Sequence, residues 1–167
     1  MTHIFCRLHF QAAAFELIPS EKRNSFRGEI GEALMKHLDP ASLEDVLFEA
    51  VSLRNCAIPD PEEERHTLAL MNLEAGLKAS SASAFDTAVI YFKAGHELLG
   101  SSGWEKDCTT MLRLCSNYAN AAFINSDLET MNLLIDEVLS KEHLSVKDKF
   151  KVYEGESDSI LPCTPIS

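Results

Sequence analysis

The fold is decided by one stretch, DPEEERHTLALMNLEAGLKASSASAFDTAVIYFKAGHELL, which spans residues 60–99. It predicts two helices joined by a short polar turn. Asp60 is placed to cap the first helix, Pro61 suits the first helical position, and Glu63 follows three residues after the cap. The run SSAS at 80–83 predicts the turn, because serine is a weak helix former that favours caps.

Apolar residues recur along both helices at helical spacing. The first helix carries two adjoining stripes, Leu70, Leu73 and Leu77, and Leu68, Met71 and Ala75. The second carries Phe85, Ala88, Val89 and Phe92. A helix that is apolar on two adjoining stripes needs neighbours on both sides. Small residues between the large ones would let those neighbours approach closely.

Breaks in the pattern divide the rest of the chain into further helices. We predict helices over 3–18, from a Ser20 cap to about His37 (with Phe26, Ile30 and Leu34 on one face), from a Ser42 cap through Leu43, Val46, Leu47 and Ala50, from Trp104 to a turn at Asn125–Ser126, from Leu128 to Leu139, and from near Ser145 to Tyr153. Residues 56–61 predict a linker with two prolines, and 100–103 (GSSG) predict a clear break. No period-2 strand is evident.

Composition narrows the class of protein and of partner. The chain has 167 residues, 46% of them hydrophobic and 25% charged, which is typical of a soluble globular protein. Its net charge of −11 disfavours nucleic acid and anionic membrane surfaces as partners. The first residues have neither the apolar core of a signal peptide nor a membrane span.

The cysteines indicate a reducing compartment. The five of them are scattered and form no Cys-x-x-Cys pair, so neither a disulfide framework nor a zinc motif is predicted. Cys108 and Cys115 lie on one helix face, together with Met111, Leu112, Ala119 and Ala122, and are expected in the core. We expect a cytoplasmic protein.

The chain contains a possible internal repeat. Phe85, Ala88 and Phe92 correspond to Leu128, Met131 and Ile135, and each pair is separated by 43 residues. Each unit is a helix, a turn containing Ser or Asn, and a second helix. The period lies within the roughly 40–47 residues of helical arrays other than tetratricopeptide repeats.

The order of motifs resembles a family. HFQAAAFELIPSEKRNSFRGEIGEALMKH (9–37), LFEAVSLRN (47–55) and ERHTLALMNLEAGLKASSASAFDTAVIYFKAGHELL (64–99) are similar to the segment that follows the nucleotide-binding module in large multidomain signalling kinases. Those proteins combine a serine/threonine-kinase-like domain, a signal-transduction ATPase, a tetratricopeptide-like helical region, a GAF domain and a histidine kinase. The run from Asn72 to Ala79 carries the most specific part of the likeness, which covers about residues 9–153.

The resemblance implies an all-α fold in which antiparallel helix pairs stack as a tetratricopeptide-like right-handed superhelix. Whereas the polar, aperiodic composition of 154–167, with its two prolines, predicts a disordered tail, the resemblance implies a helix at 1–18 like the end of a preceding ATPase C-terminal lobe and an array over 19–153. It implies no catalysis, because the family's catalytic motifs lie in other domains. After Tyr153 the family continues with apolar helices, whereas this sequence turns polar, which raises the possibility of a fragment.

No catalytic, cofactor-binding or metal-ligating residue is predicted. Gly76-Leu77-Lys78 lacks the strand and glycine spacing of a phosphate loop. His96-Glu97 lacks the second histidine of a zinc-protease helix, so we expect a partly exposed histidine near a helix end. The other histidines are dispersed, although a Cys–His pair that meets only in the fold stays open.

Other chemistry-bearing runs have structural interpretations. The acidic run at 60–64 is expected at a helix N-terminus, where it meets the positive end of the dipole. The aromatic residues Tyr91, Phe92 and Trp104 are expected in the core rather than lining a ligand groove.

The sequence therefore predicts a non-catalytic helical-repeat scaffold. Its curved surface would bind a protein partner, or relay conformational change between flanking kinase and ATPase domains. One alternative is a small helical enzyme or ligand-binding domain, whose sign would be converging polar groups that include His96 or a cysteine with a strongly shifted pKa. The other is a non-functional fragment of a longer signalling protein.

Overall fold

The computed structural model describes residues 17–142 and 144–149. Over these residues the secondary structure is helical and contains no strand, which confirms the all-α class. The chain divides into two compact units, Met1–Ile58 and Pro59–Ser167, each considered by itself. The division falls inside the array predicted over 19–153. The helix predicted at 3–18, apart from a turn and a bend at Leu17 and Ile18, and the tail at 154–167 lie outside the described residues.

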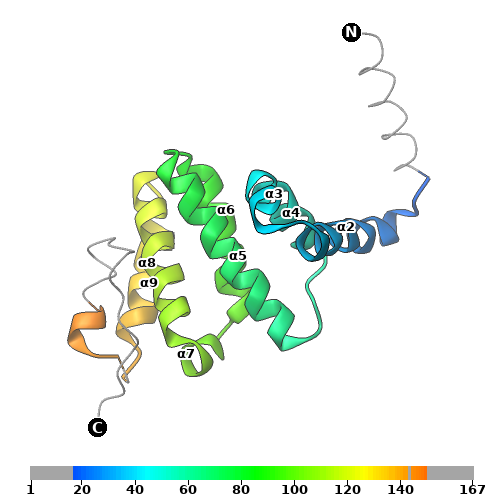
Figure 1. Cartoon of the computed structure of the whole chain (residues 1–167). Helices are drawn as coiled ribbons and strands as arrows, with labels where there is room; N and C mark the ends of the chain where they lie inside the picture. The colour runs from blue at the N-terminus through cyan, green and yellow to red at the C-terminus, as the bar shows by residue number, and fades with distance from the viewer. Residues whose placement is uncertain (1–16, 143, 150–167) are drawn as a thin grey trace. The chain divides into compact units, whose positions relative to one another are not determined.

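Short connections join most successive elements along the chain (Figure 1). They are the 3-10 helix η1 (Ser20–Lys22) and the helices α2 (Arg23–His37), α3 (Pro40–Asp45), α4 (Leu47–Arg54), α5 (Glu62–Ser81), α6 (Phe85–Leu99), α7 (Gly103–Lys106), α8 (Cys108–Ile124) and α9 (Leu128–Leu139). Residues 146–149 add one helical turn. The predicted linker before α5 and the predicted turns before α6 and α9 are confirmed.

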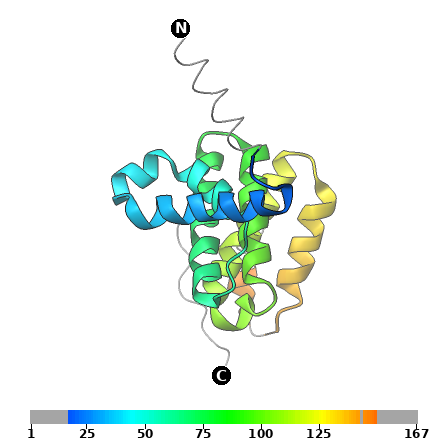
Figure 2. The same ribbon diagram turned by 90° about the vertical axis from the view of Figure 1, so that its right-hand side faces the viewer.

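In the first unit a glycine of α2 lets that helix approach the backbone of α4 closely. A side chain at Gly31 would meet the backbone of Arg54 and the carbonyl of Ala50, and one at Gly28 would meet Ala57. Figure 2 shows α2 as one continuous helix. The predicted apolar face is wrong, because Phe26 and Ile30 are 41% and 37% exposed. The close approach that glycine permits decides which face of α2 is buried.

Two predicted caps in this unit are also wrong. Asp39, not Ser42, caps α3: its carboxylate accepts from the Ser42 backbone N–H at 3.1 Å and from the Ser42 hydroxyl at 2.7 Å. Pro40 then takes the first helical position. The single helix predicted here is two, because Val46 leaves helical geometry at φ −115° and ψ 19°. Ser20 lies inside η1 and caps nothing.

In the second unit α5, α6, α8 and α9 pack in chain order, each against the next (Figure 1). The buried face of α5 differs from the predicted stripes, since Leu70 is 39% exposed and Leu77 is half-buried. Small residues make up most of the buried face, which consists of Leu68, Ala69, Asn72, Leu73, Ala75, Gly76 and Ala79. A methyl group at Gly76 would overlap the buried ring of Phe92. The large side chains of α6 therefore fit against the small ones of α5.

The start of α5 differs by one residue from the prediction. Pro61 is the N-cap residue, with extended backbone, and Asp60 lies before it. Arg65 donates instead to the carbonyls of Pro59 and Asp60. At the other end of the unit a helical turn starts near Ser145, as predicted, and the Ser145 hydroxyl accepts from the Asp148 N–H at 3.2 Å. The rest of the helix predicted to Tyr153 lies outside the described residues.

The helix predicted from Trp104 is interrupted. It consists of α7 and α8, which are separated at Asp107, and Asp107 caps α8 by accepting from the Thr110 N–H at 3.0 Å. The α8 helix is buried on nearly every side, including the predicted Met111, Leu112, Cys115, Ala119 and Ala122. Tyr91, Phe92 and Trp104 are all buried, which confirms their place in the core.

Two turns that lie 43 residues apart, the spacing of the predicted repeat, have the same backbone conformation. Ser83 and Ser126 both adopt left-handed geometry, with φ of 60° and 64°. The residue after each donates its N–H at 2.9 Å to the carbonyl five residues earlier, from Ala84 to Ala79 and from Asp127 to Ala122. The α5–α6 and α8–α9 pairs therefore share one turn conformation at equivalent positions.

Candidate functional site

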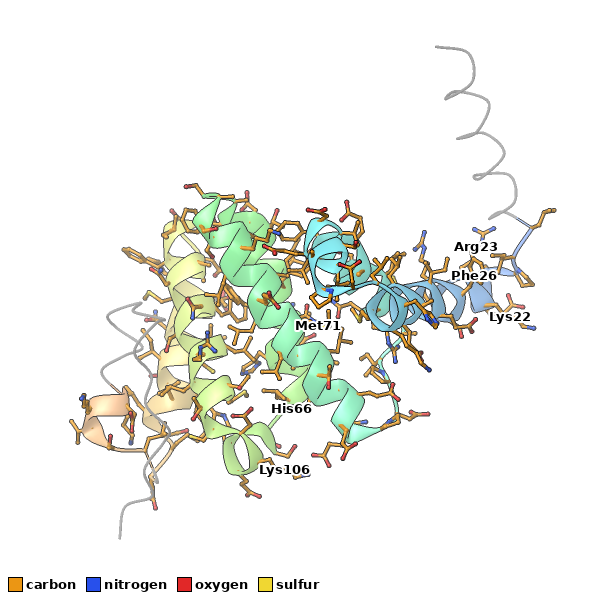
Figure 3. All side chains as sticks on the ribbon, viewed as in Figure 1. Lys22, Arg23, Phe26, His66, Met71 and Lys106 are labelled. Atoms are coloured by element: carbon orange, nitrogen blue, oxygen red, sulfur yellow. The ribbon has the colours of Figure 1, made fainter. Side chains whose placement is uncertain are left out.

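A cleft of 710 Å³ lies at one end of the second unit. Its walls come from the first turns of α5, the end of α6, the loop at 100–102 and α7. Figure 3 shows His66 of α5 and Lys106 of α7 at this end of the unit. The loop owes its sharp turn to Gly100, whose φ of +54° suits glycine.

The cleft contains a histidine–carboxylate pair. Nε2 of His66 lies 2.7 Å from Oδ2 of Asp107, and the other oxygen of Asp107 accepts from Thr110 at the start of α8. Partial burial opposes ionisation of Asp107, but the hydrogen bonds from Thr110 and His66 outweigh it and lower the pKa of the carboxyl. Asp107 thus joins α5 to the N-terminus of α8.

The rest of the cleft shows little sign of nucleophilic chemistry. The hydroxyl of Ser102 donates to the Leu99 carbonyl at 3.2 Å rather than to His66. Lys106 pairs with Glu62 across the rim, and both side chains are more than half exposed. An exposed pair of this kind contributes little to stability. The geometry orients His66 and leaves it accessible, which suits ligand contact more than covalent catalysis.

A second polar cluster lies among the packed helices of the same unit. His96 on α6, Cys115 on α8 and Glu137 on α9 bring one ligand atom each to within 4.8 Å of one another. Glu137 accepts from Trp104 Nε1 through Oε1 at 2.7 Å, and its Oε2 lies 2.9 Å from His96 Nε2. The Lys141 ammonium lies 5.2 Å from the centroid of the Trp104 ring.

The electrostatics of this cluster favour an ionised carboxylate and a neutral thiol. The hydrogen bond with His96 lowers the pKa of Glu137, and although partial burial opposes this, the bond from Trp104 reinforces it. Burial raises the pKa of Cys115 far above its usual value, with a further contribution from the charge of Glu137. Because the thiolate is the reactive form of cysteine, Cys115 is a poor nucleophile in this arrangement.

The structure brings together residues that the sequence left dispersed. His96 is partly exposed near the end of α6, as predicted, but its contact with Glu137 has no local motif. His66 and Asp107 are 41 residues apart, as are His96 and Glu137. That spacing is two residues short of the 43-residue repeat, so a search for polar pairs one repeat apart would have found neither pair.

Other residues considered for chemistry take structural places. Gly76 lies within α5 against Phe92, not in a phosphate loop. The described acidic residues Glu62, Glu63 and Glu64 occupy the first turn of α5, as predicted for the dipole. The expectation that the chain holds no catalytic or cofactor-binding residue stays a prediction.

The fold defines an all-helical protein, and two of its helix pairs share one turn conformation. In the comparison with known proteins, no protein family, curated protein or solved structure matches the chain. The resemblance to signalling kinases therefore stays a prediction. Among the described residues, no helix is both long and apolar enough to cross a membrane.

Proposed function

We propose that the chain is a non-catalytic helical-repeat scaffold. It binds a protein partner, or relays a conformational change between neighbouring domains of a signalling protein of the kind it resembles. In this proposal the helix pairs form part of a tetratricopeptide-like superhelix. The observation that carries the proposal is the repetition of the same turn and the same helix pairing 43 residues apart.

A repeated exposed apolar position supports this proposal. Ile90 on α6 and Leu133 on α9 are 64% and 65% exposed and stand at equivalent places in the two pairs. Elsewhere on α8 and α9, Phe123, Leu128 and Leu139 are also 42% or more exposed. Arrays of repeats bury their apolar faces only against neighbours, so terminal faces need a cap or a partner. Exposed apolar side chains at matching positions suit a partner that spans both pairs.

The properties of Cys115 favour this proposal over the enzyme alternative. The sign expected for an enzyme was a set of converging polar groups that includes His96 or a shifted cysteine. His96 and Cys115 do converge, but burial raises the pKa of Cys115, which is opposite to the shift that activates a nucleophile.

The test is site-specific photo-crosslinking in the cells that express the chain. A photoreactive residue at Ile90 and at Leu133 should capture the same protein, and one at the exposed polar residue Thr87 should not. The captured protein, once purified, should bind the whole chain. The double variant Ile90→Glu/Leu133→Glu should weaken that binding at least about tenfold, because a charge disfavours burial of the site.

A matched control keeps the result specific. Thr87→Glu/Asn132→Glu places the same charges on exposed polar positions of the same helices and should leave binding unchanged. Equal loss in both double variants, or no common crosslinked protein, contradicts the proposal. A cooperative thermal melt followed by circular dichroism is expected of a functional scaffold, whereas a broad melt favours the fragment alternative.

A further inference from the structure

The strongest unassigned feature is the cluster of His96, Cys115 and Glu137. The three side chains come from helices α6, α8 and α9, and their ligand atoms lie within 4.8 Å of one another. They supply an imidazole nitrogen, a sulfur and a carboxylate oxygen. Each of these donors is one that zinc takes in proteins.

The burial of the cluster suits a metal held between packed helices. Cys115 is completely buried, whereas the side chains of His96 and Glu137 are 22% and 28% exposed. An ion can therefore enter from the side of His96 and Glu137 and meet the sulfur deeper in. The bond from Trp104 fixes one oxygen of Glu137 and leaves the other directed at His96. Hydrogen bonds of this type orient metal ligands.

We propose that His96, Cys115 and Glu137 bind one divalent transition-metal ion of zinc type. Zinc bonds of about 2.0–2.3 Å in tetrahedral geometry place ligand atoms roughly 3.3–3.7 Å apart. The 2.9 Å contact between His96 and Glu137 must open slightly, and the widest separation in the cluster must shorten by about 1 Å. Rotation of side chains suffices for changes of this size.

The charges of the cluster also balance around such an ion. When zinc binds, the proton of the Cys115 thiol is released to solvent, and the resulting thiolate and the carboxylate of Glu137 neutralise the double positive charge of the ion. The Lys141 ammonium beside Trp104 repels a cation, but its single positive charge is outweighed by the two negative charges of the thiolate and the carboxylate. The fourth coordination position remains for water or a ligand. Because the three residues lie on three helices, the bound ion ties α6, α8 and α9 together. This inference does not depend on the proposed scaffold function.

The test uses the reduced whole chain, stripped of metal with a chelator and titrated with Co²⁺, then with Zn²⁺. One equivalent of cobalt should give the visible bands of tetrahedral coordination and a thiolate-to-cobalt charge-transfer band in the near ultraviolet. Zinc should displace the cobalt and raise the melting temperature, since a ligand bound only to the folded state stabilises it. Absence of a charge-transfer band in fully reduced protein would overturn the proposal.

Variants locate the site. Cys115→Ser should abolish the charge-transfer band, and Glu137→Gln and His96→Gln should each weaken cobalt binding at least about a hundredfold. Trp104→Phe removes the hydrogen bond to Glu137, together with part of the buried ring that faces Lys141, and should weaken binding about tenfold. The control Cys108→Ser, on the same helix, should bind cobalt as the wild type does.

The outcome stays interpretable if one variant fails to fold. Glu137→Gln preserves the shape of the side chain and an acceptor for Trp104, so it carries the test if Cys115→Ser is unfolded by circular dichroism. A charge-transfer band that survives in folded Cys115→Ser, or undiminished affinity in Glu137→Gln, places the metal elsewhere and overturns the assignment.

Discussion

The α5–α6 pair and the α8–α9 pair have the same turn but fill their interiors differently. Gly76 and Phe92 in the first pair stand where the second has Ala119 and Ile135. Similarly, Asn72 and Gly95 correspond to Cys115 and Val138, and all four are buried. In each case a larger residue on one helix accompanies a smaller one on the other. The turn fixes the antiparallel arrangement, whereas the division of volume between the helices varies from pair to pair.

The largest expected difference between the pairs is at Phe92. Phe92 is completely buried against Gly76, so Phe92→Ala should lower the free energy of unfolding by about 3–5 kcal/mol. Ile135→Ala, at the equivalent half-buried position, should cost only about 1–2 kcal/mol. Urea denaturation of both variants measures this. Equal losses would mean that the two pairs are packed alike.

The next effect sharpens the comparison at Gly76. Gly76→Ala should lower the free energy of unfolding by about 1–2 kcal/mol, because the clash with Phe92 exceeds the helix propensity gained. In the Phe92→Ala background the same change should stabilise the protein by up to about 1 kcal/mol, since the clash is gone. A double-mutant cycle reports the coupling. Additive effects would show that Gly76 and Phe92 do not compete for space.

A smaller effect concerns a helix cap that one pair has and the other lacks. Asp127 caps α9 by accepting from the Thr130 N–H at 3.1 Å, whereas Ala84 holds the equivalent place before Thr87. The two residues have similar backbone geometry, with φ/ψ of −88°/75° and −90°/64°. Ala84→Asp should therefore cap α6 and raise the melting temperature by roughly 3–6 °C. Asp127→Ala should lower it.

The pH dependence of this cap provides an independent check. Hydrogen bonds from the Thr130 side chain and backbone lower the pKa of Asp127 below its usual value of 3.8. A group whose pKa is lower in the folded state stabilises the protein above its unfolded pKa, and that stabilisation is lost as the pH falls through the folded value. The difference in melting temperature between wild type and Asp127→Ala should be full at neutral pH and shrink below pH about 4. A constant difference would assign the effect to something other than the carboxylate.

The smallest expected effect tests whether the turns are equivalent. Ser83→Gly and Ser126→Gly each relieve a left-handed backbone conformation, and each should raise the free energy of unfolding by about 0.5–1 kcal/mol. Thermal melts of the two single variants should agree within error. Opposite signs would show that the shared backbone geometry does not reflect shared energetics.

The sequence by itself determined most of the helices of the second unit and most of the breaks between them. Serine and glycine at 80–83 and 100–103, and Asn125–Ser126, act through local backbone preferences, so they are visible without the fold. The spacing of 43 residues and the core places of Tyr91, Phe92 and Trp104 were visible in the periodicity of apolar and aromatic residues. The breaks at Val46 and Asp107 were not, because no glycine, proline or serine adjoins either residue to mark the end of a helix.

Only the tertiary structure decided which faces are buried and which polar groups meet. The leucine stripes suggested one face of α5, but close approach to α6 selected the face with Gly76 and left Leu70 exposed. The meeting of His96, Cys115 and Glu137 was likewise settled by the packing of three helices. Periodicity records how apolar a face is, whereas burial depends on how closely a neighbour can approach, and that is a property of both surfaces together.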